Sequence, residues 1–155
     1  MDYLSNFSET LSELILIHNL NSEQLGTQIS LDSSTIRKYL SRRSYPKLQY
    51  AIKIADYFGC SLDYLFGLTN DYNKKTYLPC PPFYQAFQKS LKSHNRTQYR
   101  LYTDLGFDDQ SVSDWYHGKV IPAMYNLIRI ANYFGCTLDE LVGRKAEEIS
   151  PLQSK

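Results

Sequence analysis

The chain has 155 residues, a formal net charge of +1, 43% hydrophobic residues and three cysteines. It contains no run of about 18 apolar residues that could span a membrane, and its first residues lack the basic-then-apolar pattern of a signal sequence. An odd number of cysteines without a CxxC spacing argues against a disulfide framework and against a zinc site. We therefore expect a cytoplasmic protein that holds no metal and no other cofactor.

The sequence contains an internal repeat. Residues 57–65 read YFGCSLDYL and residues 133–141 read YFGCTLDEL, 76 positions further on. The same offset, without a gap, pairs residues 7–67 with residues 83–143. One folding unit therefore occurs twice. We expect the positions that both repeats keep to build the scaffold, and the positions that differ to determine function.

Apolar residues recur at helical spacing from the start of the first repeat. Asn21 then stands at an N-cap position, so a second helix is predicted over residues 22–29. Residues 30–31 form a tight turn that leads into a third helix. One face of the first helix is marked by Phe7, Leu11, Leu14, Ile15 and His18.

The third helix is predicted over residues 33–41, with Asp32 as its cap. A polar loop follows and ends at Pro46. The fourth helix comes next and stops at Gly59, because glycine readily takes the left-handed conformation that ends a helix. Neither repeat shows the alternating pattern of a strand.

A short fifth helix is capped by Ser61, and the second repeat has Thr137 there, in a capping box with Glu140. The sequence therefore predicts an all-α protein with five helices in each repeat. The predicted parts are a first domain, a linker with three prolines, a second domain and a short tail, at residues 1–70, 71–82, 83–144 and 145–155.

Two short helices joined by a tight turn, the second and third of five, form a helix-turn-helix arrangement. The segments NLNSEQLG, ISLDSSTIRKYL and IADYFGCSLDYL in residues 19–65 resemble the Cro/Xre-type helix-turn-helix family, which includes the lambda-like repressors. The most specific part is the ending at residues 46–65, which recurs at 122–141. The resemblance covers both repeats and implies two tandem lambda repressor-like domains.

The resemblance also implies a DNA-reading surface on the third helix. It assigns groove-facing positions to four residues and a phosphate contact to Ser22 at the start of the second helix. Serine can donate to and accept from base edges, and arginine or lysine can bind guanine or a phosphate. The four groove-facing residues are Ser33, Ser34, Arg37 and Lys38.

Residues 33–53 carry six basic side chains and no acidic one, a net charge of +6. Affinity for double-stranded DNA that does not depend on sequence needs such a cluster on one face. We expect Arg42 and Arg43, in the loop after the third helix, to contact phosphates. The six are Arg37, Lys38, Arg42, Arg43, Lys47 and Lys53.

The second repeat differs at this surface. Its matching window, residues 109–129, has two acids and two bases and therefore no net charge. Asp109 lies at the start of the third helix, and Asp114 stands where the first repeat has Lys38. Carboxylates facing phosphates are repelled. We predict that this reading surface is lost or has changed its role.

Other differences in the second repeat concern packing and charge. Tyr102 replaces Gly26 at the crossing of the second and third helices, where we expect it to push the helices apart or to turn outward. Its first two helices carry a basic edge, formed by Lys89, Lys92, Arg96 and Arg100. The side chains that would contact DNA, if this repeat binds it, are Gln98, Gln110, Ser113 and Lys119.

The first helix of the first repeat is apolar all round at residues 14–17, whereas its counterpart at residues 90–93 is one-sided. A helix that is apolar on every side is usually covered on every side. We therefore expect the second repeat, the linker or another subunit to cover Leu16 and Ile17.

We interpret the sequence as a sequence-specific DNA-binding transcriptional regulator, a bacterial or phage repressor that acts as a homodimer. The alternative is a protein-interaction module on a helix-turn-helix scaffold: an antirepressor, an antitoxin-like partner or an inhibitor. No catalytic constellation, phosphate-binding glycine loop or metal-ligand spacing is evident. We therefore expect no enzyme activity and no small-molecule ligand, and we interpret His18 and His94, which are repeat-equivalent, as structural.

Overall fold

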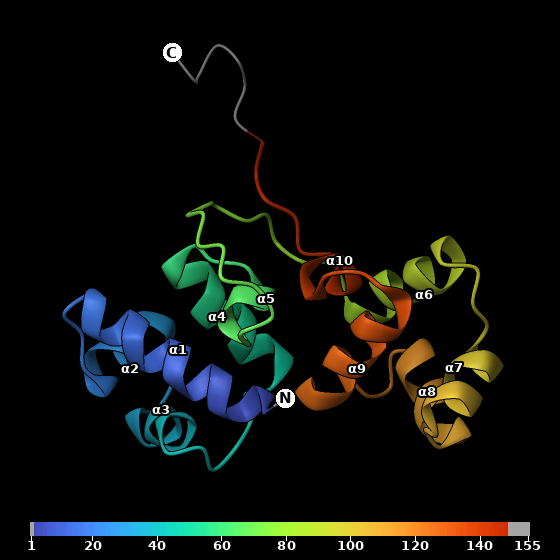
Figure 1. Cartoon of the computed structure of the whole chain (residues 1–155), viewed down its shortest axis with the longest axis horizontal. Coiled ribbons are helices and arrows are strands. Elements are labelled where there is room, and N and C mark those ends of the chain that lie inside the picture. The colour runs from blue at the N-terminus through green and yellow to red at the C-terminus, as the bar shows by residue number, and fades with distance from the viewer. Residues whose placement is uncertain (1, 149–155) are drawn as a thin grey trace. The chain divides into compact units, whose positions relative to one another are not determined.

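The computed structural model describes residues 2–148 and is helical throughout both repeats (Figure 1). An isolated antiparallel bridge between Tyr77 and Ala146 is the only strand-like pairing in this range. The prediction of an all-α protein is confirmed. No helix between residues 2 and 148 has the length and apolar character needed to cross a bilayer.

The chain divides into two compact units. The first consists of the residues up to Lys74 together with Ala123–Ile128, and the second of Lys75–Pro122 together with the residues from Arg129 onward. The start of one helix of the second repeat is thus grouped with the first unit. The predicted domain boundaries and the five helices per domain therefore stay predictions.

The helices of the first repeat begin and end where their capping residues lie. Asn21 and Gln24 form a capping box at the start of the second helix, and Gly59 ends the fourth in the left-handed conformation at φ 69°. Ser61 accepts a hydrogen bond from the backbone N–H of Tyr64 at 2.9 Å. The helices are α1 (Tyr3–Ile17), α2 (Ser22–Ile29), α3 (Ser33–Leu40), α4 (Leu48–Phe58) and α5 (Leu62–Leu65).

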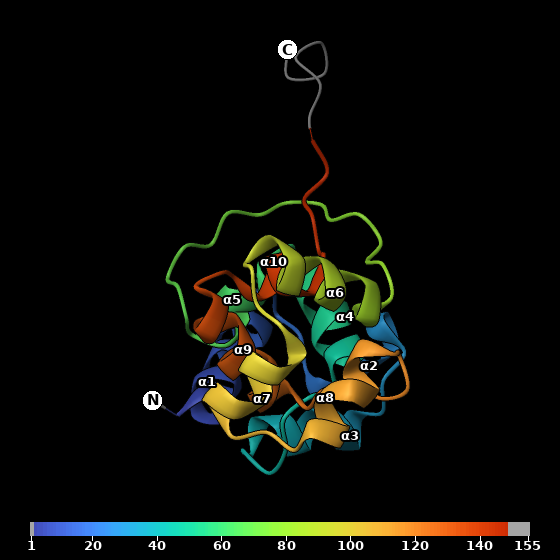
Figure 2. The same ribbon diagram turned by 90° about the vertical axis from the view of Figure 1, so that its right-hand side faces the viewer.

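The second repeat reproduces these helices at the offset of 76 residues. The bounds of the second, third and fourth helices agree residue for residue, whereas the first begins later because Pro82 stands at its N-cap. The helices are α6 (Phe83–Ser93), α7 (Gln98–Leu105), α8 (Asp109–Tyr116), α9 (Met124–Phe134) and α10 (Leu138–Val142). Within this repeat α10 packs beside α6 (Figure 2).

Each repeat has a core of its own. In the first, the ring of Phe7 stacks on Phe66 at 5.1 Å between centroids and meets Tyr39 edge-on at 5.5 Å. In the second, Phe87 and Leu101 are fully buried. Burying a side chain of this size contributes about 1.5–3 kcal/mol to folding, so these aromatic and aliphatic contacts fix the helices that carry the candidate DNA-binding residues.

Of the predicted caps, one makes no side-chain hydrogen bond and another forms only in part. Asp32 occupies the N-cap position of α3, but its side chain makes no capping hydrogen bond. Thr137 caps α10 by accepting from the backbone N–H of Glu140 at 3.1 Å. Among the described residues, no return bond runs from the Glu140 carboxylate to the cap. The predicted capping box of α10 is therefore confirmed only in its Thr137 half.

The linker pairs with the residues after α10. The N–H of Leu78 donates to the carbonyl of Lys145 at 2.9 Å, and the N–H of Glu147 donates to the carbonyl of Thr76 at 2.7 Å. The buried guanidinium of Arg144 lies 3.5 Å from the centroid of the Tyr77 ring. It also forms an ion pair of 3.0 Å with Asp139. The sequence did not indicate this pairing.

Candidate nucleic-acid interface

The α2–turn–α3 segment of the first repeat is tightly closed. Ser30 ends α2 in the left-handed conformation at φ 57°, and the N–H of Leu31 donates to the carbonyl of Gly26 at 2.8 Å. A Cβ on Gly26 would collide with the carbonyl oxygen of Leu31. The absence of a side chain at position 26 therefore lets the two helices approach closely at the predicted turn.

The predicted reading residues of α3 lie on its exposed side. Ile36 and Tyr39 are buried, whereas Ser34, Arg37 and Lys38 are exposed and Ser33 is half-buried. Burial raises the pKa of Tyr39 to about 12, so this phenol stays neutral inside the core. One helix thus separates a packed apolar face from a polar, basic face that is open to a partner.

Ser22 is the first residue of α2 and is half-buried. The capping box beside it uses the N–H groups of Asn21 and Gln24 at 2.9 and 2.7 Å. The N-terminus of a helix carries a partial positive charge and favours an anion. The position of Ser22 agrees with the phosphate contact that the sequence predicted, although the contact itself is untested.

The loop after α3 holds Arg42 and Arg43, both exposed. Arg42 adopts a left-handed conformation at φ 62°, which is unfavourable for a residue with a Cβ. Its guanidinium pairs with Glu9 on α1 at 3.1 Å, and both side chains are more than half exposed. Such an exposed ion pair contributes little to stability, so the guanidinium can exchange Glu9 for a phosphate. Nothing in the sequence pattern indicates Glu9 as its partner.

Each repeat ties its first helix to the end of its third helix by a different bond. In the first repeat the hydroxyl of Ser8 donates to the carbonyl of Tyr39 at 2.5 Å. In the second, the amide of Gln88 donates to the carbonyl of Tyr116 at 2.8 Å. Both bonds tie the end of the third helix to the first helix of the same repeat.

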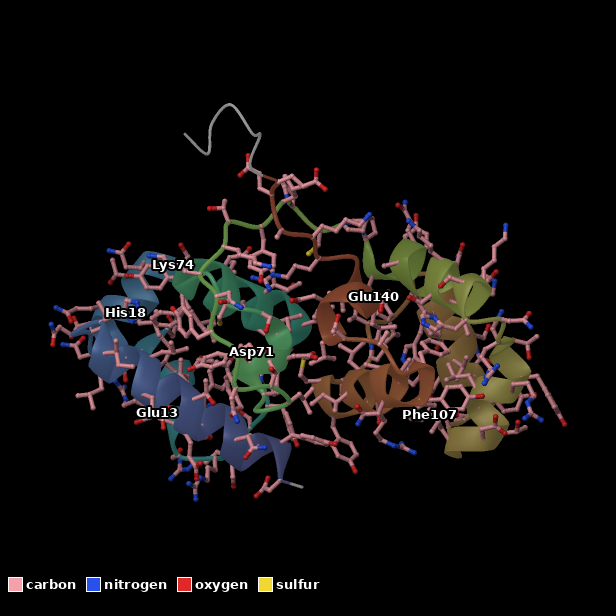
Figure 3. The ribbon with its side chains drawn as sticks, turned by 45° about the horizontal axis from the view of Figure 1, so that its top comes forward. Glu13, His18, Asp71, Lys74, Phe107 and Glu140 are labelled. Atoms are coloured by element: carbon pink, nitrogen blue, oxygen red, sulfur yellow. The ribbon has the colours of Figure 1, made fainter. Side chains whose placement is uncertain are left out.

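The turn of the second repeat is built differently. Gly106 takes the left-handed conformation at φ 72°, and the ring of Tyr102 lies against the exposed ring of Tyr99 at 5.4 Å. Tyr102 thus turns outward, which is one of the two outcomes that the sequence predicted. Phe107, labelled in Figure 3, follows the turn, and its ring meets Trp115 edge-on at 5.1 Å.

Arg129, on α9, packs its side chain against this turn. Its guanidinium lies 4.5 Å from the centroid of the Phe107 ring and donates to the carbonyl of Leu105 at 2.5 Å. The charge count of residues 109–129 had included Arg129 as a surface charge. The signal that could have revealed this role is a paired change between the repeats, from Leu31 and Lys53 to Phe107 and Arg129.

The exposed side of α8 is acidic, and its polar residues are engaged with one another. The amide of Gln110 donates to the carboxylate of Asp114 at 3.0 Å, and the hydroxyl of Ser113 lies 3.3 Å from Nδ1 of His117. Two of the four candidate DNA contacts of this repeat therefore have partners on their own helix. Lys119 is exposed in the following loop.

Gln98, the remaining candidate, lies in an open cleft of about 700 Å³ between α6, α7 and the end of α8. Thr97 caps α7 there by accepting from the N–H of Arg100 at 3.1 Å. Three of the four residues of the basic edge line this cleft, so cationic side chains and a helix N-terminus face the same space. The fourth, Arg100, instead forms an ion pair of 3.4 Å with Asp104 on α7. The polar and charged lining residues include Lys89, Lys92, Arg96, Thr97 and Gln98.

The corresponding side of the first repeat carries the opposite charge. A cleft of about 350 Å³ between α1 and the end of α3 is lined by Glu9, Glu13 and Arg42. Glu13 is labelled on α1 in Figure 3. Glu13 occupies the repeat position of Lys89. Anions are therefore disfavoured at this side of the first repeat and favoured at the same side of the second.

Leu16 and Ile17 are 75% and 70% exposed. No residue of the first repeat covers them. Leu16 takes the repeat position of Lys92, so an apolar side chain replaces a cation that lines the basic cleft of the second repeat. Their cover by another part of the protein or by another subunit stays a prediction.

Comparison with known families agrees with this geometry. A family model described as helix-turn-helix matches residues 11–65, and one described as a Cro/C1-type HTH DNA-binding domain matches residues 87–147. No curated protein and no solved structure matches the chain. The predicted family and its tandem occurrence are confirmed, and the chain carries two tandem helix-turn-helix domains of the Cro/Xre type.

Proposed function

We propose that this protein is a sequence-specific DNA-binding transcriptional regulator, a bacterial or phage repressor that acts in the cytoplasm and reads the major groove with α3. The observation that carries the proposal is the exposed face of α3, where Arg37 and Lys38 lie beside Ser34. They lie opposite the buried Ile36 and Tyr39. Side chains of these types read base edges, and the six bases of residues 33–53 supply attraction to phosphates.

The test separates sequence-specific contacts to bases from general attraction to phosphates. Arg37→Ala or Lys38→Ala should weaken binding to the specific site by about 1–3 kcal/mol and relax base preference. Arg42→Ala and Arg43→Ala should weaken binding to all sequences alike and flatten the salt dependence. Gel-shift titrations with the protein's own promoter region and with a scrambled duplex, at two salt concentrations, distinguish the two effects.

Lys74→Ala in the linker is the matched control, because it removes a charge outside the candidate surface and should leave both affinities unchanged. Unchanged DNA affinity in both the Arg37/Lys38 and the Arg42/Arg43 variants at low salt would exclude the first repeat as the reader.

We infer a different role for the second repeat. Its basic cleft suits sequence-independent contact with the phosphate backbone, because it joins three cations to the N-terminus of α7. Its third helix, with Asp109 and Asp114, suits neither a phosphate nor most base edges. In this proposal the second repeat strengthens binding without adding sequence information.

The proposed active form is a homodimer. One reading domain contacts about one half-site, and proteins with this motif present two, roughly 34 Å apart. If only α3 reads, the second reader comes from a second chain related by two-fold symmetry. Leu16 and Ile17, largely exposed on α1, are the proposed contact.

Leu16→Glu with Ile17→Lys should lower the molecular mass in solution to that of one chain and reduce affinity for a palindromic operator. Sedimentation and gel shift measure the two quantities. A folded double mutant that keeps both its mass and its affinity excludes these residues as the interface. A strictly monomeric wild-type protein on a single non-palindromic site excludes the dimer.

One observation favours a second candidate function. The acidic, exposed α8 resembles an interaction surface for a basic partner more than a DNA reader. A protein-interaction module, such as an antirepressor, an antitoxin-like partner or an inhibitor, would use this face and leave the first repeat without a specific site. The absence of any preferred DNA sequence in a selection from random duplexes would favour that function.

A further inference from the structure

Three side chains that are distant in the sequence meet in the second repeat. His94 follows α6 and Cys136 lies in the turn before α10. Glu140, labelled in Figure 3, lies on α10. One ligand atom of each, an imidazole nitrogen, the thiol sulfur and a carboxylate oxygen, lies within 4.8 Å of the other two. No ligand spacing along the sequence predicts a metal site, but the fold brings together one residue after α6, one before α10 and one on α10.

The hydrogen bond of His94 defines which ring nitrogen can bind a cation. Nδ1 lies 2.8 Å from the carbonyl oxygen of Ser90. A carbonyl oxygen only accepts, so Nδ1 carries the proton and Nε2 keeps the free electron pair. The ring also stacks on Phe134 with an interplanar angle of 6°. Histidines that bind metals are commonly oriented by such a bond from the other ring nitrogen.

The other two residues are accessible and suitably oriented by the short α10. Cys136 is half-buried and Glu140 is exposed. Thr137 caps α10 through the backbone of Glu140, and no described bond commits the carboxylate to that cap. The carboxylate can therefore adjust its position by rotation of its side chain at little cost, while the backbone around it stays fixed.

We propose that His94, Cys136 and Glu140 form a binding site for a divalent transition metal ion of the zinc type. Zinc binds Cys, His and carboxylate ligands at roughly 2.0–2.3 Å in tetrahedral geometry. Ligand atoms are then roughly 3.3–3.8 Å apart, which a modest contraction of the observed cluster supplies. A mixed set of sulfur, nitrogen and oxygen selects zinc or cobalt over magnesium or calcium, which prefer oxygen ligands only.

Three protein ligands leave the fourth position of the ion for water. Binding releases the thiol proton of Cys136 to solvent, so the ligand charges balance those of the cation. The ion would join the end of α6 to α10 and so cross-link two helices that already pack together. Occupancy therefore raises the stability of the second repeat.

The first repeat provides an internal control. His18 and Cys60 occupy the same positions, and Nδ1 of His18 lies 2.8 Å from the carbonyl oxygen of Leu14. The position of Glu140 is taken by Tyr64, whose ring packs edge-on against Tyr72 at 5.0 Å. The histidine and cysteine thus belong to the shared scaffold, and the carboxylate is what completes the site in the second repeat alone.

The experiment is a titration of the full-length, tag-free and fully reduced protein with Co²⁺, after treatment with a chelator. We expect one ion per chain and an absorption band from a cobalt–thiolate bond. Glu140→Gln should lower the affinity at least about tenfold, and Cys136→Ser should abolish the band. Cys60→Ser and Cys80→Ser are the matched controls and should keep it. Zn²⁺ should displace the cobalt and raise the thermal unfolding temperature.

Absence of saturable binding overturns the proposal. So does a thiolate band that persists in Cys136→Ser, or an affinity that is unchanged in Glu140→Gln. Because Glu140 is exposed, its variant is expected to fold, and it decides the question alone if Cys136→Ser does not fold. None of these measurements involves DNA, so their outcome is independent of the proposed regulatory function.

Discussion

The two repeats share a backbone but carry their basic side chains on different helices. In the first, the bases follow α3 and the loop after it, whereas α1 presents Glu9 and Glu13. In the second, the bases line the cleft between α6 and α7, whereas α8 presents Asp109 and Asp114. The charge pattern is reversed between equivalent surfaces of one scaffold.

This reversal separates two properties that a single helix-turn-helix domain usually combines. Contacts to base edges provide sequence specificity, and contacts to phosphates provide position and general affinity. In the proposed function, the first repeat makes the base contacts with its third helix, and the second repeat makes phosphate contacts beside the start of its second helix. Exchanging residues between equivalent positions tests whether this difference is functional.

The largest expected effect concerns the loop after the third helix. Gly118 adopts φ 77°, and a Cβ there would lie 2.8 Å from an atom of the Tyr84 ring. Gly118→Arg, which introduces the residue of the first repeat, should destabilise the protein by about 2–4 kcal/mol. Urea unfolding followed by circular dichroism measures the change.

Gly106→Ser is the matched control for this prediction. Gly106 also has a left-handed conformation, at φ 72°, but no atom lies within 4 Å of its added Cβ. This variant should lower the free energy of unfolding by only about 1 kcal/mol. Equal losses in the two variants would show that the contact with Tyr84 is unimportant.

The second prediction concerns the basic cleft. Replacing Lys89, Lys92 and Arg96 by alanine should weaken binding to specific and scrambled duplexes equally and by about tenfold or more at low salt. The slope of log K against log salt should fall by about 2–3, because each phosphate contact contributes about 0.9. An unchanged slope would show that the second repeat does not contact DNA.

A smaller effect is expected on α8. Replacing Asp109 and Asp114 by alanine should keep specific binding and raise non-specific affinity by about threefold, because two repulsive charges are lost. Gel shifts with scrambled DNA measure this change. Loss of specific binding would instead show that the two acids read cytosines and that both repeats act as readers in tandem.

The smallest effect is expected at Arg42. Arg42→Gly, the reverse of the first exchange, relieves the left-handed conformation at φ 62° and removes the exposed ion pair with Glu9. We expect a gain of about 0.5 kcal/mol in stability, since the relief exceeds the small contribution of the pair. DNA affinity should fall in the same variant. A loss of stability would show that the ion pair outweighs the strain.

Much of the fold could be predicted because its signals are local. The bounds of α2, the turn at Ser30 and the stop at Gly59 depend on caps and on glycine, which act within a few residues. The exposed face of α3 followed from its helical period. The groove-facing candidates on that face came from the resemblance to the Cro/Xre-type family and stay predictions.

The remaining features depend on side chains that meet across long stretches of chain. Arg129 reaches Phe107 and Arg144 reaches Tyr77, and neither pairing leaves a periodic pattern. The cluster of His94, Cys136 and Glu140 likewise requires the packing of α10 on α6. A charge count along residues 109–129 treats Arg129 as a surface residue. The sequence therefore overestimated the basic character of the surface that these residues form.

The pairing of the linker with the residues after α10 also limits the length of linker that is not bonded to either repeat. The hydroxyl of Tyr72 donates to the carbonyl of Phe58 at 2.6 Å in the first unit, and Thr76 is bonded to Glu147 in the second. Only residues 73–75 lie between these two attachment points. Even fully extended, the chain from Tyr72 to Thr76 reaches about 14 Å.

If both repeats bind DNA as proposed, a linker of this length makes the second contact an intramolecular event with a high effective concentration. With α3 on its site, the second repeat would then meet a nearby phosphate at an effective concentration of about the millimolar range, so even a weak cleft would be occupied. Inserting flexible residues between Asn73 and Lys75 should lower this effective concentration and weaken overall binding without changing either surface. The proposed function therefore makes linker length a determinant of DNA affinity.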